Sequence, residues 1–228
     1  MKKKWLAFCI AALVMTLALS SGLAVQAGDH VYFGHYEQDN VTDNGPEPIE
    51  WRILEINGNE AMMISLYGLD ICPYSTSNTK CSWEKSTIRA WLNDNFYNAA
   101  FTDEDKKCII TKELTTKYDP AVTADPVTLI TCQDALRIFV DHPDRRATAT
   151  PYCTAQGVYV SKKFAPATHY WARNPSWEHY DKASYIAASG GVMKCGGPQV
   201  TPNYMVRPLI YFDLTSRDLE TAPHSQQK

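Results

Sequence analysis

The feature that most constrains the fold is an aromatic block near the C-terminus. It consists of Tyr-Trp-Ala-Arg-Asn-Pro at 170–175, Tyr-Ile-Ala-Ala-Ser-Gly-Gly-Val at 185–192, and Met-Val-Arg-Pro-Leu-Ile-Tyr at 205–211. Aromatic and β-branched residues favour strands. The block therefore predicts an aromatic strand, a hairpin and a closing strand, with an arginine close before a proline at each end. The block indicates the core of the fold more clearly than it indicates a catalytic or binding function.

A second hairpin is predicted in the N-terminal half. Residues 50–56 and 60–65 flank Asn57-Gly58, the dipeptide best suited to the positive φ angles of a type I′ turn. Residues 31–36 predict a short preceding strand, and the polar residues 39–48 predict a turn-rich loop. We expect the two strands beside Asn57-Gly58 to be antiparallel.

Helices are predicted in the middle of the chain. Apolar residues recur at helical spacing after a polar entry, which predicts an amphipathic helix over 83–100. Thr102 with Asp105, and Thr131 with Asp134, resemble capping boxes and predict two short helices.

The segments around these helices carry turn signals. We expect Pro143 to end the helix that begins after Thr131, and a further helical turn over 143–155. Residues 115–126 are polar and contain two prolines, which predicts an exposed loop. The polar residues 215–228 predict a frayed tail.

Residues 1–27 have the features of a signal peptide. Lys2, Lys3 and Lys4 form a basic start, residues 5–19 are mainly apolar, and Ala27 offers a small residue for cleavage. The apolar run is short for a membrane span, which needs about 20 residues. We expect an exported protein, secreted or at the cell surface, without a permanent membrane anchor.

The mature chain fits a single domain. Removing 27 of 228 residues leaves 201, and we expect the domain to cover 28–214. The removed segment holds three of the 22 basic residues and no acidic one. The mature chain therefore has 19 basic and 25 acidic side chains, a formal charge of −6, which argues against a nucleic-acid partner.

Six cysteines remain after residue 27, an even number that permits disulfides in an exported protein. Fifteen connectivities are possible if all six pair. Cys72 and Cys81 are close enough in sequence to close a single loop, so they are the first candidate pair. The wide spacings and the absence of a C-x-x-C motif disfavour zinc.

Several segments together resemble a known family. The segments at 31–39, 48–54 and 86–93, followed by the C-terminal block, resemble the bacterial domain-of-unknown-function 6273 family in the same order. The family's Trp-Leu-Arg-Ser-Pro corresponds to residues 171–175, and its Val-Arg-Pro-Ala-Leu to 206–210. This chain departs from the family pattern at Asn174 and Cys195.

The resemblance implies a fold. The family is similar to C-type-lectin-like domains and to formylglycine-generating-enzyme-like domains. We therefore expect an α+β, C-type-lectin-like domain of antiparallel strands and hairpins with two or three helices. Related domains display their ligand surface between the two motifs, although one fold hosts many functions.

Two arginines are candidate ligand-binding residues. Arg173 and Arg207 could hold a carboxylate or phosphate through two parallel hydrogen bonds. The structural alternative is that each lies buried at a strand end and donates to backbone carbonyls or to a core acid such as Glu50. The sequence favours this alternative.

Aromatic residues offer a second kind of binding surface. Trp177, Tyr180 and Tyr204 lie in predicted loops, where rigid rings could contact a sugar or a partner protein. Trp171 and Tyr185 are expected in the core.

No metal, cofactor or catalytic residue is predicted. His169 and His179 bracket the tryptophan segment, but loop histidines are usually solvated. The Glu-Pro-Asn and Trp-Asn-Asp motifs of calcium-dependent lectins do not occur. Cys153 and Cys195 invite comparison with the copper-binding cysteines of formylglycine-generating enzymes, but their flanking residues do not match.

We therefore expect an exported, non-catalytic module that binds an extracellular glycan, peptide or protein. The alternatives are a copper-dependent thiol oxidase and a structural envelope protein.

Overall fold

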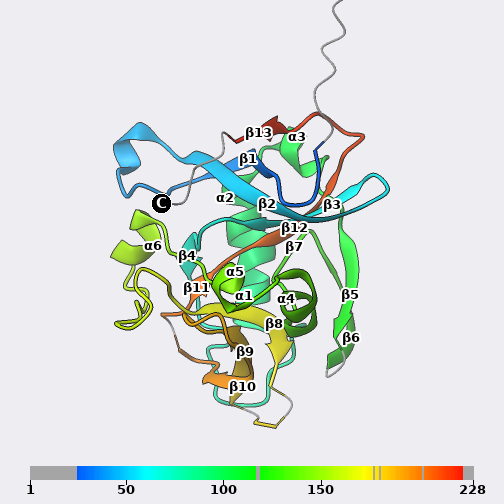
Figure 1. Cartoon of the computed structure of the whole chain (residues 1–228). Coiled ribbons are helices and arrows are strands. Elements are labelled where there is room, and N and C mark those ends of the chain that lie inside the picture. Colours follow the sequence, from blue (N-terminus) through cyan, green and yellow to red (C-terminus); the bar gives the residue numbers. More distant parts are fainter. Residues whose placement is uncertain (1–24, 117–118, 177, 180, 202, 223–228) are drawn as a thin grey trace, which may run out of the picture.

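Two β-sheets form the frame of this α+β protein (Figure 1). The computed structural model describes residues 25–116, 119–176, 178–179, 181–201 and 203–222. One sheet has six strands and the other has five, and most neighbouring strands are antiparallel. Short helices lie around and between them, more than the two or three that we expected. None of the described helices is long and apolar enough to cross a membrane.

The six-stranded sheet joins both ends of the described chain. Its order is β13-β1-β2-β3-β12-β7, and every pairing in it is antiparallel. Its strands are β1 (His30–Tyr36), β2 (Glu47–Asn57), β3 (Glu60–Ser65), β7 (Val127–Thr128), β12 (Leu209–Asp213) and β13 (Glu220–Thr221).

The five-stranded sheet contains the aromatic block. Its order is β10-β9-β8-β11-β4, with β11 parallel to β8. Its strands are β4 (Asp70–Ile71), β8 (Tyr170–Pro175), β9 (Lys182–Ile186), β10 (Val192–Pro198) and β11 (Met205–Val206). The predicted strand, hairpin and closing strand are confirmed as β8, β9–β10 and β11–β12.

The β2–β3 hairpin is confirmed, but its turn is displaced by one residue. Asn57 pairs with Glu60 as part of the ladder, so the two-residue loop is Gly58-Asn59. Gly58 has φ of +60°, while Asn59 is not among the described residues with positive φ. A type I′ turn needs positive φ at both central positions, and a type II′ turn needs it only at the first. The type I′ prediction is therefore wrong.

The predicted helix over 83–100 begins four residues later. Ser86 is its N-cap, and its hydroxyl accepts the Arg89 backbone N–H at 3.2 Å. The residues before Ser86 stay outside the helix because this cap fixes its first turn. The helical run comprises α1 (Thr87–Trp91), the π-helical segment η2 (Leu92–Phe96) and α2 (Tyr97–Ala100).

The capping residues were predicted correctly. Thr102 and Asp105 form a capping box, and the Thr131 hydroxyl accepts the Asp134 N–H at 2.9 Å. Pro143, however, does not end a helix but lies in the first turn of α5, where a missing N–H costs nothing. The remaining helices are η1 (Thr42–Asn44), α3 (Asp103–Lys106), α4 (Cys132–Ile138), α5 (His142–Arg145) and α6 (Pro151–Ala155).

The segment predicted as an exposed loop over 115–126 is instead a hairpin of β5 (Lys112–Thr116) and β6 (Asp119–Asp125). Its buried anchor is the Asp125 carboxylate, which is 1 % exposed. This carboxylate accepts Arg89 Nε at 2.7 Å, Trp83 Nε1 at 2.8 Å and Thr123 Oγ1 at 2.7 Å. Polar composition was misleading because two of these partners, Arg89 and Trp83, lie far from Asp125 in sequence.

The prediction of a frayed tail over 215–228 is also wrong for the residues of that range that the structure describes. Glu220 and Thr221 form β13 and pair with Tyr32 and Val31 of β1. Arg217 adds an ion pair at 2.7 Å with Asp105. Residues 223–228 lie outside the described residues.

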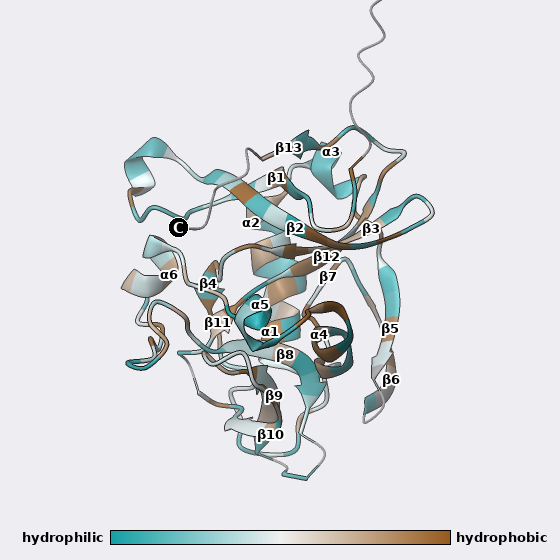
Figure 2. Cartoon of the chain, viewed as in Figure 1, coloured by the Kyte–Doolittle hydropathy of each residue, from teal (hydrophilic) through white to brown (hydrophobic). Residues whose placement is uncertain are grey.

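The interior has two apolar clusters. The larger lies between the six-stranded sheet and the α1–α2 run and includes Trp51, Phe96 and Phe212. The smaller includes Phe139 of the α4 region and Ile186 of β9. Figure 2 shows apolar residues gathered on β2, β3, β12 and these helices, with hydrophilic residues on the outer turns.

The Asp125 network predicts a large stability effect. Asp125→Ala should lower the free energy of unfolding by about 3–5 kcal/mol, because it leaves Arg89 and the Trp83 indole N–H without their buried acceptor. Urea denaturation measures this loss. The control is Asp103→Ala, whose side chain is 97 % exposed, and it should stay close to wild type. Equal stability of the two variants would contradict the anchoring role.

Candidate functional site

An aromatic cluster forms where four separate segments meet at the five-stranded sheet. The cluster consists of Tyr159, His169, Trp171, Tyr185 and Tyr204. Backbone bonds join its segments: Tyr159 N–H donates to the Asn203 carbonyl at 2.9 Å, and Met205 N–H donates to the His169 carbonyl at 3.0 Å. The Thr168 hydroxyl also donates to the Tyr159 carbonyl.

The strand register of β8, β9 and β10 places one row of side chains at the base of the cluster. Trp171 of β8 pairs with Tyr185 of β9, which pairs with Met193 of β10. Directly paired residues present their side chains on the same face, so these three form one row across the strands. Trp171 is fully buried, and its indole N–H donates to the Cys72 carbonyl at 2.8 Å. Met193 at the other end is 42 % exposed.

The rings contact one another closely. Tyr204 lies 4.7 Å from Trp171, 4.9 Å from Tyr185 and 5.0 Å from His169, measured between ring centroids. Tyr159 stacks on His169 at 4.7 Å with an interplanar angle of 25° and remains 41 % exposed. The cluster therefore runs from a buried tryptophan to a solvent-facing tyrosine.

Two glycines of β10 make room for the rings. A Cβ on Gly196 would lie 2.3 Å from Tyr185 Cε1, and one on Gly197 would lie 2.8 Å from Tyr204 Cε2. Any larger residue would have to displace a ring. The two glycines therefore allow the strand backbone to approach the tyrosines directly.

The cluster combines apolar ring faces with polar groups. The rings of Tyr185 and Tyr204 are in contact, and burial together with the nearby Tyr185 and Tyr159 raises the pKa of Tyr204. His169 Nδ1 accepts the Ala188 backbone N–H at 2.8 Å, and burial lowers the pKa of His169. His169 is therefore neutral at pH 7, with its proton on Nε2.

Of the predicted ligand-binding residues that the structure describes, only Tyr204 lies in this cluster. Trp177 and Tyr180 lie outside the described residues. Trp171 is in the core, as expected, and Tyr185 is partly buried. Tyr159 and His169 were not predicted, because each is a single residue in an unremarkable loop and only the tertiary contacts unite them.

Arg173 and Arg207 adopt the structural alternative. They are 6 % and 3 % exposed, and each donates to a backbone carbonyl: Arg173 Nη2 to Thr115 at 2.9 Å, and Arg207 Nε to Ser65 at 2.6 Å. Burial lowers the pKa of both guanidinium groups. Their remaining unpaired nitrogens, Arg173 Nε and Arg207 Nη1, are buried and out of reach of an external ligand.

The cysteines do not form the expected bridge. No disulfide joins any of the six cysteines of the described chain, and Cys72 and Cys81 are buried thiols. Cys153 lies on α6, which contacts β4, whereas Cys195 lies on β10. These strands are the two opposite edges of the five-stranded sheet. The structure therefore does not bring Cys153 and Cys195 together as a copper-binding pair.

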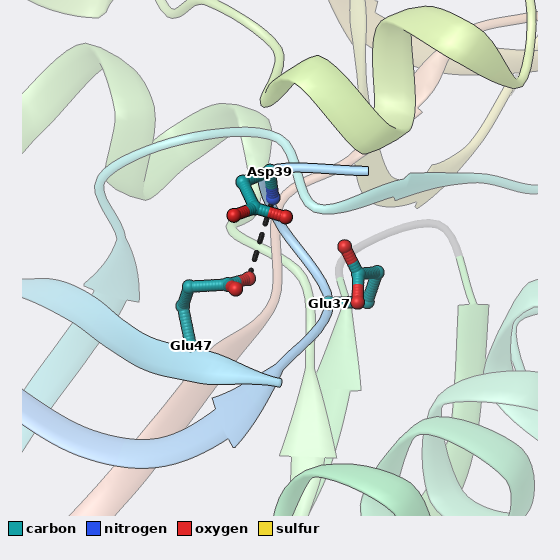
Figure 3. A group of neighbouring side chains, drawn as sticks. All are labelled: Glu37, Asp39 and Glu47. Atoms are coloured by element: carbon teal, nitrogen blue, oxygen red, sulfur yellow. Dashed lines mark hydrogen bonds between the residues drawn. The ribbon is translucent and has the colours of Figure 1, made fainter. Parts of the chain in front are cut away.

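Three carboxylates gather where the loop after β1 meets the start of β2 (Figure 3). Among the described residues, Glu37, Asp39 and Glu47 are the group that could hold a metal ion, with oxygens within 4.8 Å of one another. Backbone N–H groups already donate to them, from Gln38 to Glu47 at 2.7 Å and from Val41 to Asp39 at 2.7 Å. These donors give the group a structural role in shaping the loop.

The neutral His169 predicts a pH dependence of stability. Its pKa is lowered from 6.5 in the folded state, so the unfolded state takes up a proton first as the pH falls. Its contribution should be complete above pH 6.5 and lost as the pH falls towards the folded pKa. Urea midpoints at pH 7.5 and 5.0 should differ more in wild type than in His169→Gln. An identical pH dependence in both would contradict this assignment.

Comparison with known proteins identifies a family but no characterised relative. No curated protein and no solved structure matches the chain. Residues 58–214 match the family described as Domain of unknown function (DUF6273). The match begins within the β2–β3 hairpin, so the resemblance at 31–39 and 48–54 lies outside it. Because the match covers more than half of the chain, this protein belongs to the DUF6273 family.

Proposed function

We propose that this protein is an exported, non-catalytic module that binds an extracellular glycan through the aromatic cluster. The observation that carries the proposal is the combination of the exposed Tyr159 ring, stacked on neutral His169, with the adjoining tyrosine hydroxyls of Tyr185 and Tyr204. Sugars present C–H faces that pack on aromatic rings and hydroxyls that need hydrogen-bond partners. Tyrosine supplies both in one rigid side chain.

The composition of the cluster supports a neutral ligand. The five cluster residues carry no charge at pH 7, and the two buried arginines are occupied by backbone carbonyls. A neutral oligosaccharide requires no charged partner in its site. An acidic peptide or a phosphate would need a cation, and none of the cluster residues supplies one.

The rigid support of the rings also fits a binding role. Trp171 fixes one side of Tyr204, and the Ala188 N–H fixes the orientation of the His169 ring. A preorganised site loses little side-chain entropy when a ligand binds. We further propose a C-type-lectin-like arrangement for the domain, supported by the mainly antiparallel sheets and short helices together with the family resemblance.

Binding to an array of immobilised oligosaccharides tests this function. Tyr159→Ala should weaken binding of any oligosaccharide retained by wild type at least tenfold, because it removes the exposed ring. Tyr67→Ala is the matched control, since Tyr67 is a 37 % exposed tyrosine outside the cluster, and it should bind as wild type does. Absence of binding to all oligosaccharides, or equal binding by Tyr159→Ala, would contradict the proposal.

Export is tested separately. Residues 1–27 should be removed during secretion, because Val25-Gln26-Ala27 fits signal-peptidase cleavage. N-terminal sequencing of protein collected outside the cytoplasm should begin at Gly28, whose backbone N–H donates to the Ile53 carbonyl at 2.8 Å. Retention of Met1 in that protein would contradict cleavage.

A further inference from the structure

Two cysteines lie near each other where α4 meets the outer strands of the five-stranded sheet. Cys132 is the first residue of α4, and its backbone N–H donates to Asn174 Oδ1 of β8 at 2.8 Å. This bond fixes the start of the helix over the sheet. The helix also contacts β9 and β10, and Cys195 belongs to β10.

Strand register places Cys195 opposite Ser184. Met193 pairs with Tyr185 and Gly197 pairs with Ala183, with a register irregularity between them, so Cys195 lies across from Ser184. The Ser184 hydroxyl donates to the Lys194 carbonyl at 2.7 Å. The same hydroxyl and Cys195 both lie close enough to the Cys132 thiol to change its pKa. Ser184 therefore lies beside both cysteines.

The two thiols differ in their access to solvent. Cys132 is 2 % exposed, and burial raises the pKa of its thiol to about 11, although Ser184 and Lys194 oppose the increase. Cys195 is partly exposed. A thiol can attack a partner's disulfide only if the partner can reach it. Oxidation therefore begins at Cys195.

We propose that Cys132 and Cys195 form a disulfide when the protein meets an oxidised thiol–disulfide exchange partner. The structure is then the dithiol form of a site in which oxidation ties α4 covalently to β10. This inference shares the export step with the proposed function but does not depend on glycan binding.

The exchange balances in atoms and electrons. The Cys195 thiolate attacks one sulfur of the partner's disulfide, which breaks, and the first partner thiolate leaves. The Cys132 thiolate then attacks the Cys195 sulfur and releases the second partner thiolate. The protein loses two protons and two electrons, and the partner's disulfide is reduced to two thiols.

The other buried cysteines are in less favourable positions. The thiols of Cys72, Cys81 and Cys108 donate to backbone carbonyls of neighbouring residues. Burial raises the pKa of Cys72 to about 12, and it also raises the pKa of Cys153, in each case with an added effect of nearby Asp70. A partly exposed thiol distinguishes the proposed pair, because each of these four is buried.

The proposed bond would stabilise the strand beneath the aromatic cluster. Cys195 directly precedes Gly196 and Gly197, which contact Tyr185 and Tyr204. A link from β10 to α4 would oppose separation of this edge strand from β9. Oxidation outside the cytoplasm would therefore hold β10 in place beside the tyrosines of the cluster.

Peptide mapping of the purified protein tests the proposal. The protein is incubated with an excess of oxidised glutathione or with reduced glutathione, alkylated, digested and analysed by mass spectrometry. Oxidation should yield a peptide that links Cys132 to Cys195, and reduction should leave both alkylated. Cys108→Ser, which changes a cysteine of the other apolar cluster, should retain the link.

Thermal unfolding provides an independent readout. The bond would close a loop of 195 − 132 = 63 residues, so the oxidised protein should melt roughly 10 °C above the reduced protein. Cys195→Ser should lose this difference, and its partly exposed position makes it better tolerated than a change at buried Cys132. Full alkylation of both cysteines after oxidation, or a link from either to another cysteine, would overturn the proposal.

Discussion

The buried Arg207 side chain stabilises the junction on which the rest of the structure depends. The chain leaves the five-stranded sheet at Val206 and enters the six-stranded sheet at Leu209, so Arg207 lies between the two sheets. Its Nε donates to the Ser65 carbonyl, at the point where the β3–β4 connection makes the opposite crossing. Ser65 N–H donates back to the Pro208 carbonyl at 2.9 Å. These reciprocal bonds hold two crossings side by side and satisfy backbone groups that would otherwise be buried without partners.

The aromatic cluster is built directly onto this junction. Tyr204 comes three residues before Arg207, and the intervening β11 is held between β8 and β4. The Arg207 guanidinium also lies 5.4 Å from the Tyr170 ring centre, next to Trp171 on β8. The same segment therefore joins the sheets and fixes the position of a candidate binding residue. A buried arginine that serves the fold thus supports the site without contacting a ligand.

Local signals in the sequence were reliable where neighbouring residues satisfy one another. Thr102 caps α3 through Asp105, three residues away, and the β2–β3 hairpin needs only Gly58 and its flanking strands. Predictions failed where the partner is remote. The β5–β6 hairpin depends on Arg89 and Trp83, and β13 depends on pairing with β1, so composition alone made both segments resemble loops.

The aromatic strands and most of the caps could be predicted from the sequence because they follow from short-range periodicity and hydrogen bonding. The family and the α+β class followed from the resemblance of the chain's ordered motifs to known domains. Which residues form a site depends on contacts between distant parts of the chain. Tyr159, His169, Tyr185 and Tyr204 come from four separate segments, and only backbone bonds between those segments place their rings within about 5 Å. The structural role of Arg173 and Arg207 likewise depends on the whole fold, since it follows from their burial. Contacts between residues distant in sequence are set by the closing of the sheets, a constraint that no local pattern carries.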